Sequence, residues 1–564
     1  MKFSEYKYER PNLVEVKKEF EKAIKIISTS KNIDEVDKAF NDINKVRNEF
    51  NSMENLCSIR NSINTLDEFY EKEKDFFDEN LPLFSEMENN LAYTLVTCPL
   101  TKELEEKYGN QFFDLIRTSL KTFKPEIIED LQEENRLVTK YDKLIASAKI
   151  QFCDKILNLP QMVPYLESKD RQVRKDAETA YFNFFKENVA EFDSIYDSLV
   201  KVRDRIAKKL GFKNFIPLGY ARLGRTDYDD SMVKNYRKQV YESLVPVTSY
   251  LAKKKAERLG IKDMKSYDFK LDFLSGNPTP KGDCKWQVEQ AKKMYHEMNK
   301  ETGEFIDLMT DNELMDLESK KGKVGGGYCT YIAKYSSPFI FANFNGTSGD
   351  VNVLTHEAGH AFQVYSSRGF NIPEYQWPTL EACEIHSMSM EFFAWPWLDL
   401  FFKEDTNKYK YYHLCSTLTF IPYGVAVDEF QHEVFEHPEW TPKDRKNTWR
   451  QIEKKYMPEI IYENEFIDEG NYWLRQGHIF TTPFYYIDYT LAQVCAQQFF
   501  IKNQKNHEEA WEDYYRLCQT GGSKSFLNLL KVANLENPFV DGTINKVVEE
   551  LKKYLEVFDK MDIR

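Results

Sequence analysis

Apolar residues recur at helical spacing along most of the chain, and this periodicity constrains the fold more than any other feature. In residues 12–28 one helical stripe consists of Leu13, Val16, Phe20, Ala23, Ile24 and Ile27. Residues 34–56 and 137–157 repeat the pattern, and residues 171–210 form a long charged amphipathic stretch that ends at Gly211. No fixed period relates these segments, so they predict a mostly helical globular protein rather than a repeat solenoid.

Strand signals are few, and the one convincing sheet signal lies between residues 324 and 346. Two β-prone runs, at residues 328–333 and 339–344, are separated by a short polar segment and followed by Asn345-Gly346, a favoured turn pair. The next residues, TSGD, are helix N-cap types. The predicted order is therefore strand, strand, turn, helix. Residues 266–274 also alternate briefly, and the chain beyond the sheet is again predicted to be mostly helical.

Charge and composition limit the partners and the cellular setting. The 564 residues carry a net charge of -14 without a block of Lys and Arg, so neither nucleic acid nor an anionic membrane is the expected partner. No run approaches about eighteen apolar residues, and the start has no secretory signal pattern. The nine cysteines stand singly, which is typical of reduced thiols. We expect a cytoplasmic protein.

Two histidines four residues apart, with a glutamate after the first, lie in VLTHEAGHAFQ at residues 353–363. On a helix His356 and His360 share a face and can direct ring nitrogens at one ion, while Glu357 can reach a water on its open side. This is the residue pattern of a zinc hydrolase. The apolar flanks predict that both histidines are largely buried. Gly359 inside this helix predicts close approach by another element.

A second histidine pair, His432 and His437, is five residues apart. This spacing splays two side chains apart on a helix, so we interpret both as structural.

A tetrahedral zinc site needs a third protein ligand. Residues 379–395, which predict a helix ending before Pro396, offer Glu381, Glu384, His386 and Glu391. Glu384 and Glu391 are seven residues apart and share a helix face. One of them can bind the metal while the other accepts the N–H of a ligating histidine. Carboxylates on an apolar helix are rarely buried unless they are paired or metal-bound, which favours this interpretation.

HEAGHA from His356 and EIHSMSME from Glu384, with the preceding PFIFANFNGTSGDVNVLTHE, resemble the thimet oligopeptidase and oligoendopeptidase F family of zinc peptidases. The shorter bacterial members, oligoendopeptidase F and Pz-peptidase, look most alike. The resemblance runs from about Val200 to Phe539. It implies a mostly α, elongated, gluzincin-like fold with a small β-sheet beside the HExxH helix and a deep substrate channel. It also implies that Glu384, rather than Glu381, is the third zinc ligand.

The same resemblance assigns hydrogen-bond donors to the segment at residues 474–493. Family members use a histidine and tyrosines from this region to bind the tetrahedral intermediate, which here implies His478, Tyr489 and Tyr485. A phenol O–H stays neutral at pH 7 and can stabilise an oxyanion. Pro483 stands where larger members carry a glycine-rich spacer. We predict Tyr489 as the oxyanion donor, with Tyr485 as the second choice.

The predicted activity is hydrolysis of internal bonds of short oligopeptides, with one Zn²⁺ per chain. Glu357 would take the proton of a metal-activated water and pass it to the leaving amine, while His478 and Tyr489 stabilise the oxyanion.

The predicted strand at residues 339–344, with Phe341 and Ala342, is expected to bind an extended peptide by strand addition. Gly326, Gly327 and Tyr328 in the VGGGY segment would allow the peptide backbone to approach closely. A plain turn explains the glycines equally well.

Two regions are predicted, an N-terminal helical region at residues 1–195 and a catalytic region at 196–564, packed around one channel. Two alternative functions remain. A zinc carboxypeptidase on a similar helical fold would need a carboxylate-binding arginine, for which Arg475 is the nearest candidate. A catalytically inactive peptide-binding scaffold is disfavoured by the intact Glu357 and the complete ligand set.

Overall fold

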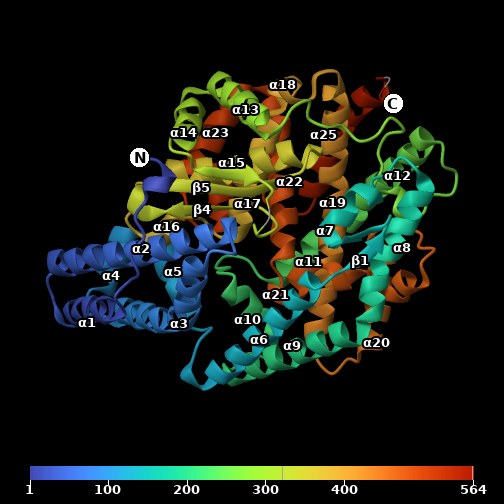
Figure 1. Cartoon of the computed structure of the whole chain (residues 1–564). Helices are drawn as coiled ribbons and strands as arrows, with labels where there is room; N and C mark the ends of the chain where they lie inside the picture. Colours follow the sequence, from blue (N-terminus) through green and yellow to red (C-terminus); the bar gives the residue numbers. More distant parts are fainter. Residues whose placement is uncertain (321, 562, 564) are drawn as a thin grey trace.

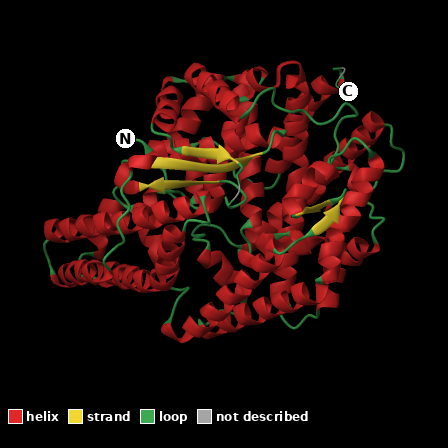
Figure 2. Ribbon diagram, viewed as in Figure 1, coloured by secondary structure: helices red, strands yellow, loops and turns green. Residues whose placement is uncertain are grey.

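Helices surround one small sheet and a separate two-stranded hairpin in the computed structural model, which describes residues 1–320, 322–561 and 563 (Figures 1 and 2). The first helices are α1 (Leu13–Thr29), α2 (Ile33–Ile63), α3 (Glu68–Thr97), α4 (Thr101–Tyr108) and α5 (Asn110–Ser119). They are followed by α6 (Ile128–Ala146), α7 (Leu159–Leu166), α8 (Arg171–Glu187), α9 (Val189–Lys209), α10 (Phe215–Arg222), α11 (Asp230–Gln239) and α12 (Val245–Leu259).

The second half of the chain contains α13 (Cys284–Met298), α14 (Lys300–Asp311), α15 (Ser348–Ser367), α16 (Pro373–Gln376), α17 (Leu380–Phe393), α18 (Asp399–Phe402), α19 (Thr406–Glu436) and α20 (Pro442–Tyr456). It ends with α21 (Gly477–Thr481), α22 (Tyr486–Lys505), α23 (His507–Thr520), α24 (Phe526–Val532) and α25 (Thr543–Asp559). Among the described residues no helix is both long and apolar enough to cross a membrane.

The helical prediction for the start of the chain is confirmed. Asn12 caps α1 by accepting from the backbone N–H of Val14 and Glu15, and Phe20, Ala23 and Ile27 on the predicted stripe are buried. Helix α1 packs against α2 and α3 to form the arm at the left of Figure 1. The segment at 34–56 lies within α2, as predicted.

The predicted helix at residues 137–157 is wrong in its second half. Helix α6 ends at Ala146, and the following residues form an antiparallel hairpin of β1 (Ile150–Phe152) and β2 (Lys155–Leu157). Its two turn residues, Cys153 and Asp154, have φ of 48° and 59°. Left-handed backbone at both central positions suits the twist of a two-residue hairpin. The turn contains no glycine, and it therefore gave no turn signal in the sequence.

The stretch at residues 171–210 is two helices instead of one. Helix α8 ends where Asn188 leaves helical geometry, and α9 continues to the predicted end, where Gly211 has φ of 89°. The brief alternation at 266–274 is not a strand; it contains a short 3-10 helix, Ser266–Asp268. The carboxylate of Asp268 bonds to Arg171 and Arg174 there.

Both predicted strands of the sheet are confirmed, but the sheet contains a third strand. Strands β4 (Tyr328–Ile332) and β5 (Ser337–Phe344) are antiparallel, and β3 (Met315–Glu318) pairs in parallel with the other edge of β5. The strand order is β3-β5-β4. The short β3 was missed because MDLE alternates over only four residues and contains no β-branched or aromatic residue.

The prediction that a peptide adds to the strand at 339–344 is wrong, because both edges of β5 are already paired. The side chains of Phe341 and Ala342 are fully buried. The outer edge belongs to β4. Asn55 of α2 donates to the carbonyl of Tyr331 at 3.0 Å, so this carbonyl points away from β5. Cys329 lies two residues earlier on the strand, and its backbone groups therefore face the same outer side.

Helix α15 packs on α17, which packs along α22. A Cβ at Gly359 would lie 2.6 Å from the carbonyl oxygen of His386 and 2.6 Å from the Cα of Ser387. The close approach predicted at Gly359 is thus confirmed, and its partner is the backbone of α17. This contact sets the distance between the HEAGH motif and the glutamates of α17.

Gly359→Ala should destabilise the protein although alanine favours helices by about 1 kcal/mol, because overpacking against fixed backbone costs about 1–3 kcal/mol. Gly369→Ala is the control, since no heavy atom lies within 4 Å of a Cβ there. Calorimetry should show a lower unfolding midpoint for Gly359→Ala alone. Equal midpoints for both variants would contradict the packing argument.

Candidate metal and catalytic site

His356, His360 and Glu384 come together between α15 and α17. Their ligand atoms all lie within 4.8 Å of one another, and among the described residues no other group of this kind is found. Oε2 of Glu384 is 3.3 Å from Nε2 of His356 and 3.5 Å from Nε2 of His360. Ligands bound tetrahedrally at about 2.0–2.2 Å are about 3.3–3.6 Å apart, so these separations fit a zinc ion. Both histidines are largely buried, as predicted, with side-chain accessibilities of 21% and 13%.

Glu391 fixes the orientation of the His356 ring through Nδ1, the nitrogen that is not directed at Glu384. Its Oε1 lies 2.7 Å from Nδ1 of His356, and its Oε2 accepts from Nε2 of His413 at 2.8 Å and from Asn352 at 2.7 Å. Because Nδ1 of His356 donates to the carboxylate, Nε2 keeps its lone pair for a metal. Burial alone would raise the pKa of Glu391, but the bonds from the two histidines lower it to about 2.

The tautomer of His413 is fixed in turn. Trp395 donates its indole N–H to Nδ1 of His413 at 3.0 Å. An Nδ1 that accepts leaves Nε2 as the donor toward Glu391. The donors therefore converge on Glu391: Trp395 donates to His413, and His413 and His356 each donate to the carboxylate.

Glu384 is fixed by two hydroxyl groups. Ser387 donates to Oε2 at 3.0 Å and Tyr485 donates to Oε1 at 3.0 Å. Burial would raise the pKa of Glu384, but the imidazoles of His360 and His356 lower it well below the usual range. The carboxylate is thus ionised and oriented toward the histidines.

Glu357 lies beside the ligand group but has a different environment. It is 7% exposed, and its Oε2 has no hydrogen-bond partner among the described residues. Burial raises its pKa, while the nearby imidazoles act in the opposite direction. Gly327 borders this carboxylate, since a Cβ at Gly327 would be 3.6 Å from Oε1. A buried carboxylate with a free oxygen is suited to accept a proton from a small ligand.

His478 is oriented as a neutral donor. Gln476 donates to its Nδ1 at 2.9 Å, and Tyr423 donates to the other end of the same amide at 2.8 Å. With Nδ1 accepting, Nε2 carries the proton. Burial lowers the pKa of His478, so the ring is neutral at pH 7. Its ring lies 5.7 Å from that of Tyr489 and 5.8 Å from that of Tyr485.

The three tyrosines of this segment, Tyr485, Tyr486 and Tyr489, do not have equivalent surroundings. The hydroxyl of Tyr485 bonds to Glu384, and its ring lies 4.8 Å from that of Tyr489 in a tilted arrangement. Burial raises the pKa of Tyr489, and Glu384 adds to this effect, so the phenol keeps its proton. Tyr486 packs on Tyr423 and Phe420 and 5.0 Å from the ring of His478.

Glu381 and His432 both lie outside the ligand group. Glu381 is buried and bonds to Thr379; burial and Asp488 raise its pKa to about 8. His432 bonds to the carbonyl of Asp428 and lies 3.1 Å from Arg237, so its structural interpretation holds.

Sequence reasoning missed several residues that orient the site, namely Asn352, Trp395, His413, Tyr423 and Gln476. No spacing rule points to His413, because it lies on α19 and meets Glu391 only through packing. Gln476 carried a weak signal, since it is two residues before His478.

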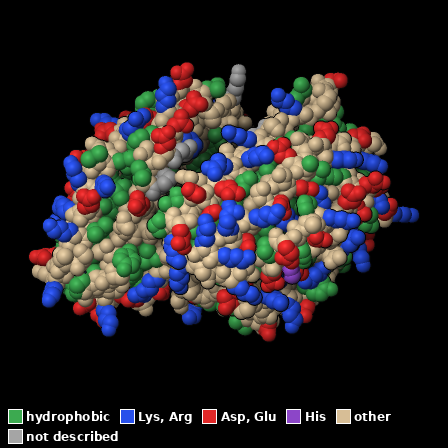
Figure 3. All heavy atoms as spheres, turned by 90° about the horizontal axis from the view of Figure 1, so that it is seen from below, with side chains coloured by type: hydrophobic (Ala, Val, Ile, Leu, Met, Phe, Trp, Pro, Cys, Tyr) green, Lys and Arg blue, Asp and Glu red, His purple; other side chains and the backbone are tan. Residues whose placement is uncertain are grey.

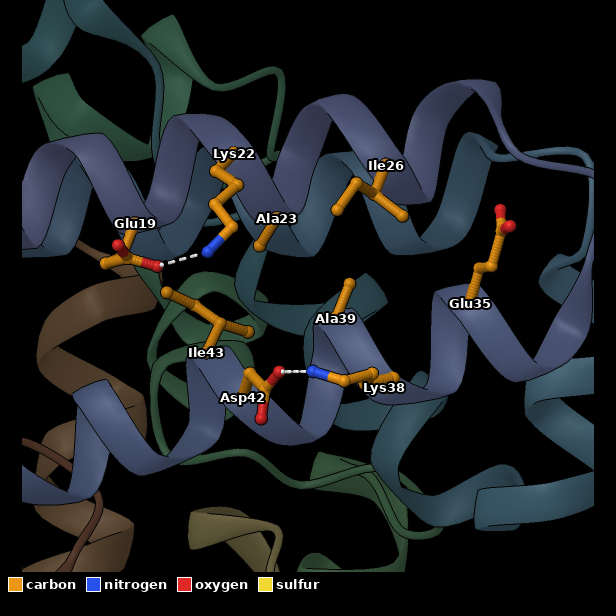
Figure 4. A pocket seen from close by; sticks show the side chains of 9 residues that line it. All are labelled: Glu19, Lys22, Ala23, Ile26, Glu35, Lys38, Ala39, Asp42 and Ile43. Atoms are coloured by element: carbon orange, nitrogen blue, oxygen red, sulfur yellow. Dashed lines mark hydrogen bonds and ion pairs between the residues drawn. The ribbon is translucent and has the colours of Figure 1, made fainter.

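A separate surface pocket lies between α1 and α2 in the arm (Figure 4). Two ion pairs line the pocket, Lys22 with Glu19 on α1 and Lys38 with Asp42 on α2. It contains no residue of the site above.

Comparison with known proteins assigns this geometry to a family. The model of peptidase family M3 matches residues 164–549, and the model of the peptidase M3 N-terminal domain matches residues 3–123. The chain belongs to peptidase family M3. The match extends further than the predicted resemblance, which began at about residue 200. The predicted division after residue 195 falls within α9 and stays a prediction.

Individual relatives agree with this assignment. A solved structure of Pz peptidase A with an inhibitor is 54% identical, covers 100% of both chains and has a TM-score of 0.95. A candidate oligoendopeptidase F from Bacillus anthracis is 52% identical over 100% of this chain and 99% of that one, with a TM-score of 0.90. An oligoendopeptidase F homologue of Borreliella burgdorferi is 27% identical over 69% of this chain and 67% of its own. The M3 protein described here is a metalloendopeptidase, and its predicted helical fold is confirmed.

Glu384→Ala, His356→Ala and His360→Ala should each abolish tight binding of one zinc per chain, since each removes one of three ligands. Glu381→Gln is the matched control, because Glu381 is equally buried, one turn earlier on α17, and its raised pKa leaves it neutral. Metal analysis after dialysis tests this. Loss of zinc from Glu381→Gln and its retention by Glu384→Ala would reverse the ligand assignment.

Proposed function

We propose that this M3 peptidase is a zinc-dependent endopeptidase that cleaves internal bonds of short oligopeptides. The observation that carries the proposal is the triad of His356, His360 and Glu384 at tetrahedral spacing with the unpartnered Oε2 of Glu357 beside it. An inactive scaffold would have no need of this buried, unpaired oxygen, which costs free energy to maintain.

The residues present fit one zinc ion held by His356, His360 and Glu384. Such an ion, when bound, would acidify a water and polarise a carbonyl. Glu391 and the donors behind it hold the His356 ring in the tautomer that a metal needs. Tyr485 and Ser387 hold the Glu384 carboxylate in place.

Glu357 is proposed as the general base. Its Oε2 has no competing donor, and burial raises its pKa toward the range in which a carboxylate can both take and return a proton. It would accept the proton of the attacking water and deliver it to the leaving amine.

His478 and Tyr489 are proposed as the donors to the oxyanion of the tetrahedral intermediate. Because Gln476 donates to Nδ1 of His478, the ring proton is on Nε2, where it can be donated. The neighbouring Tyr489 keeps its phenolic proton. Tyr485, whose hydroxyl already donates to Glu384, is proposed as a positioning residue for this ligand.

The peptide is proposed to add to the outer edge of β4. Gly326 and Gly327 are exposed, and no heavy atom lies within 4 Å of a Cβ at Gly326. Backbone at residues 327–329 can therefore receive an extended peptide next to Glu357. Tyr328 stacks on Phe341 and holds β4 in place. Figure 3 shows a hollow on one face of the molecule, with acidic and basic side chains around it.

We further propose that the enzyme works in the cytoplasm on peptides, without nucleic-acid or membrane partners. All nine cysteines are free thiols, which suits a reducing compartment.

Glu357→Gln should keep zinc and bind peptides, but its turnover should fall by about a thousandfold or more, because an amide cannot take the proton of the water. The matched control is Glu374→Gln, a partly buried glutamate that pairs with Arg47 on α2. Rates on a fluorogenic peptide, alongside zinc content, decide the point. Near-normal turnover in Glu357→Gln would rule Glu357 out as the base.

Tyr489→Phe should lower kcat roughly a hundredfold, about 2.7 kcal/mol, with little change in KM, because the lost bond strengthens only as charge develops. His478→Ala should resemble it with zinc content unchanged. Tyr486→Phe, which removes a neighbouring hydroxyl from the same helix, should stay near wild type. If Tyr486→Phe carries the kcat loss and Tyr489→Phe does not, the donor assignment is wrong.

A further inference from the structure

Arg475 is a partly buried arginine that has no carboxylate partner within the described part of the chain. Among the described residues its one side-chain hydrogen bond is from Nη2 to the hydroxyl of Tyr472 at 2.7 Å, and its Nε is buried with no partner. A guanidinium removed from bulk water is costly unless an anion compensates it. The other partly buried arginines of this region have such anions; Arg450, for example, bonds to Asp468 and Glu453.

The groups that surround Arg475 are mainly aromatic. The guanidinium lies over the ring of Tyr472 at 4.1 Å and near the ring of Tyr423 at 5.5 Å. The neighbouring carboxylate, Glu453, is already bonded to Tyr462 and Arg450. Tyrosine rings attract the cation but do not neutralise it, so the site keeps one uncompensated positive charge.

A second cation strengthens this positive site. Enclosure by protein, with the charge of Arg475, lowers the pKa of Lys270 to about 8, although Glu167 and Asp272 act in the opposite direction. Asp272 is occupied by Lys255 at 2.7 Å. Lys270 is exposed to solvent, so it is accessible to a ligand.

Arg475 is linked to the catalytic donors by a short series of rings. The ring of Tyr423 lies 5.8 Å from that of Tyr486, which lies 5.0 Å from His478. The hydroxyl of Tyr423 also bonds to Gln476, which orients His478. A peptide whose scissile bond is held at His478 can therefore place a carboxylate at Arg475 a few residues away along the extended chain.

We propose that Arg475, assisted by Lys270, binds a carboxylate of the peptide substrate and so sets which bond is presented to the catalytic residues. This inference rests on the proposed peptidase function. The carboxylate is the C-terminus of the peptide or an acidic side chain. A guanidinium provides the planar pair of donors that a carboxylate prefers. The rings of Tyr472 and Tyr423 fix the orientation of the Arg475 guanidinium.

The test measures peptide binding without turnover. Zinc-loaded Glu357→Gln protein is titrated by fluorescence anisotropy with a labelled peptide lacking Asp and Glu, as its free acid and as its C-terminal amide. The acid should bind about tenfold more tightly. Adding Arg475→Gln should raise Kd for the acid to the value for the amide and leave the amide unchanged, and Arg475→Lys should keep part of the difference. Arg171→Gln, which removes an arginine that lies over the ring of Tyr267 and already pairs with Asp268, should keep all of it.

A second arm identifies the source of the carboxylate. Amidated peptides with Asp or Asn at each position are compared in the same way. If Arg475 increases the affinity for the free acid over the amide, the bound carboxylate is the C-terminus. If it increases the affinity for Asp over Asn at one position, the bound carboxylate is that side chain. Either result supports the proposal. If Arg475→Gln weakens binding of the acid and the amide equally, or changes the binding of neither, Arg475 is structural and the proposal is overturned. Should Arg475→Gln fail to fold, an unchanged acid-to-amide ratio in Arg475→Lys has the same meaning.

The same assay separates this inference from the proposed function. Cleavage by the parent enzyme without any carboxylate preference would leave the peptidase proposal intact and remove the role of Arg475. If instead the carboxylate preference depends on Arg475 but the parent enzyme cleaves no peptide, the role of Arg475 stands and the peptidase proposal is overturned.

Discussion

The contact of α15 with α17 at Gly359 is the constraint on which the site depends. With no Cβ at this position, the backbone of α15 approaches the carbonyl of His386 and the Cα of Ser387 closely. Two rigid helices at this separation bring His356 and His360 from one and Glu384 from the other to within 4.8 Å. Because packed helices move as units, a side chain added here would shift all three groups together.

The same ring chemistry gives two histidines opposite roles. Glu391 accepts from Nδ1 of His356, which leaves Nε2 as a lone pair for a metal. Gln476 donates to Nδ1 of His478, which leaves Nε2 as a donor for an oxyanion. The difference lies wholly in the neighbouring residue, because a neutral imidazole has one donor and one acceptor nitrogen. Each neighbour is itself fixed, Glu391 by His413 and Gln476 by Tyr423.

Three glutamates within the site likewise differ in pKa because their surroundings differ. The histidine bonds keep Glu391 ionised, and the two imidazoles keep Glu384 ionised, despite the burial of both. Glu357 lacks such bonds, and burial raises its pKa instead. The arrangement thus contains a structural carboxylate, a ligand and a base, in line with the general rule that enzymes assign roles to identical side chains through desolvation and hydrogen bonding.

Local periodicity determined a great deal of this protein. Helical stripes predicted α1 and α2, the β-prone runs predicted β4 and β5, and the i, i+4 spacing placed His356 and His360 on one face, because these features depend only on neighbours along the chain. Resemblance to a family was needed to prefer Glu384 over Glu381, which spacing alone left open.

Tertiary structure decided the rest. The third strand left β4, rather than β5, at the edge of the sheet, and this outcome depends on a pairing across the chain that no local pattern encodes. His413 meets Glu391 only because the tertiary fold brings these two residues of α19 and α17 together, and among the described residues Arg475 has no carboxylate partner while the nearby Glu453 is bonded to Arg450. The sequence specifies which side chains exist and how each local segment folds. Which of them meet, and which remain unpaired, follows from long-range packing, since contact energies between distant segments have no signature in local order.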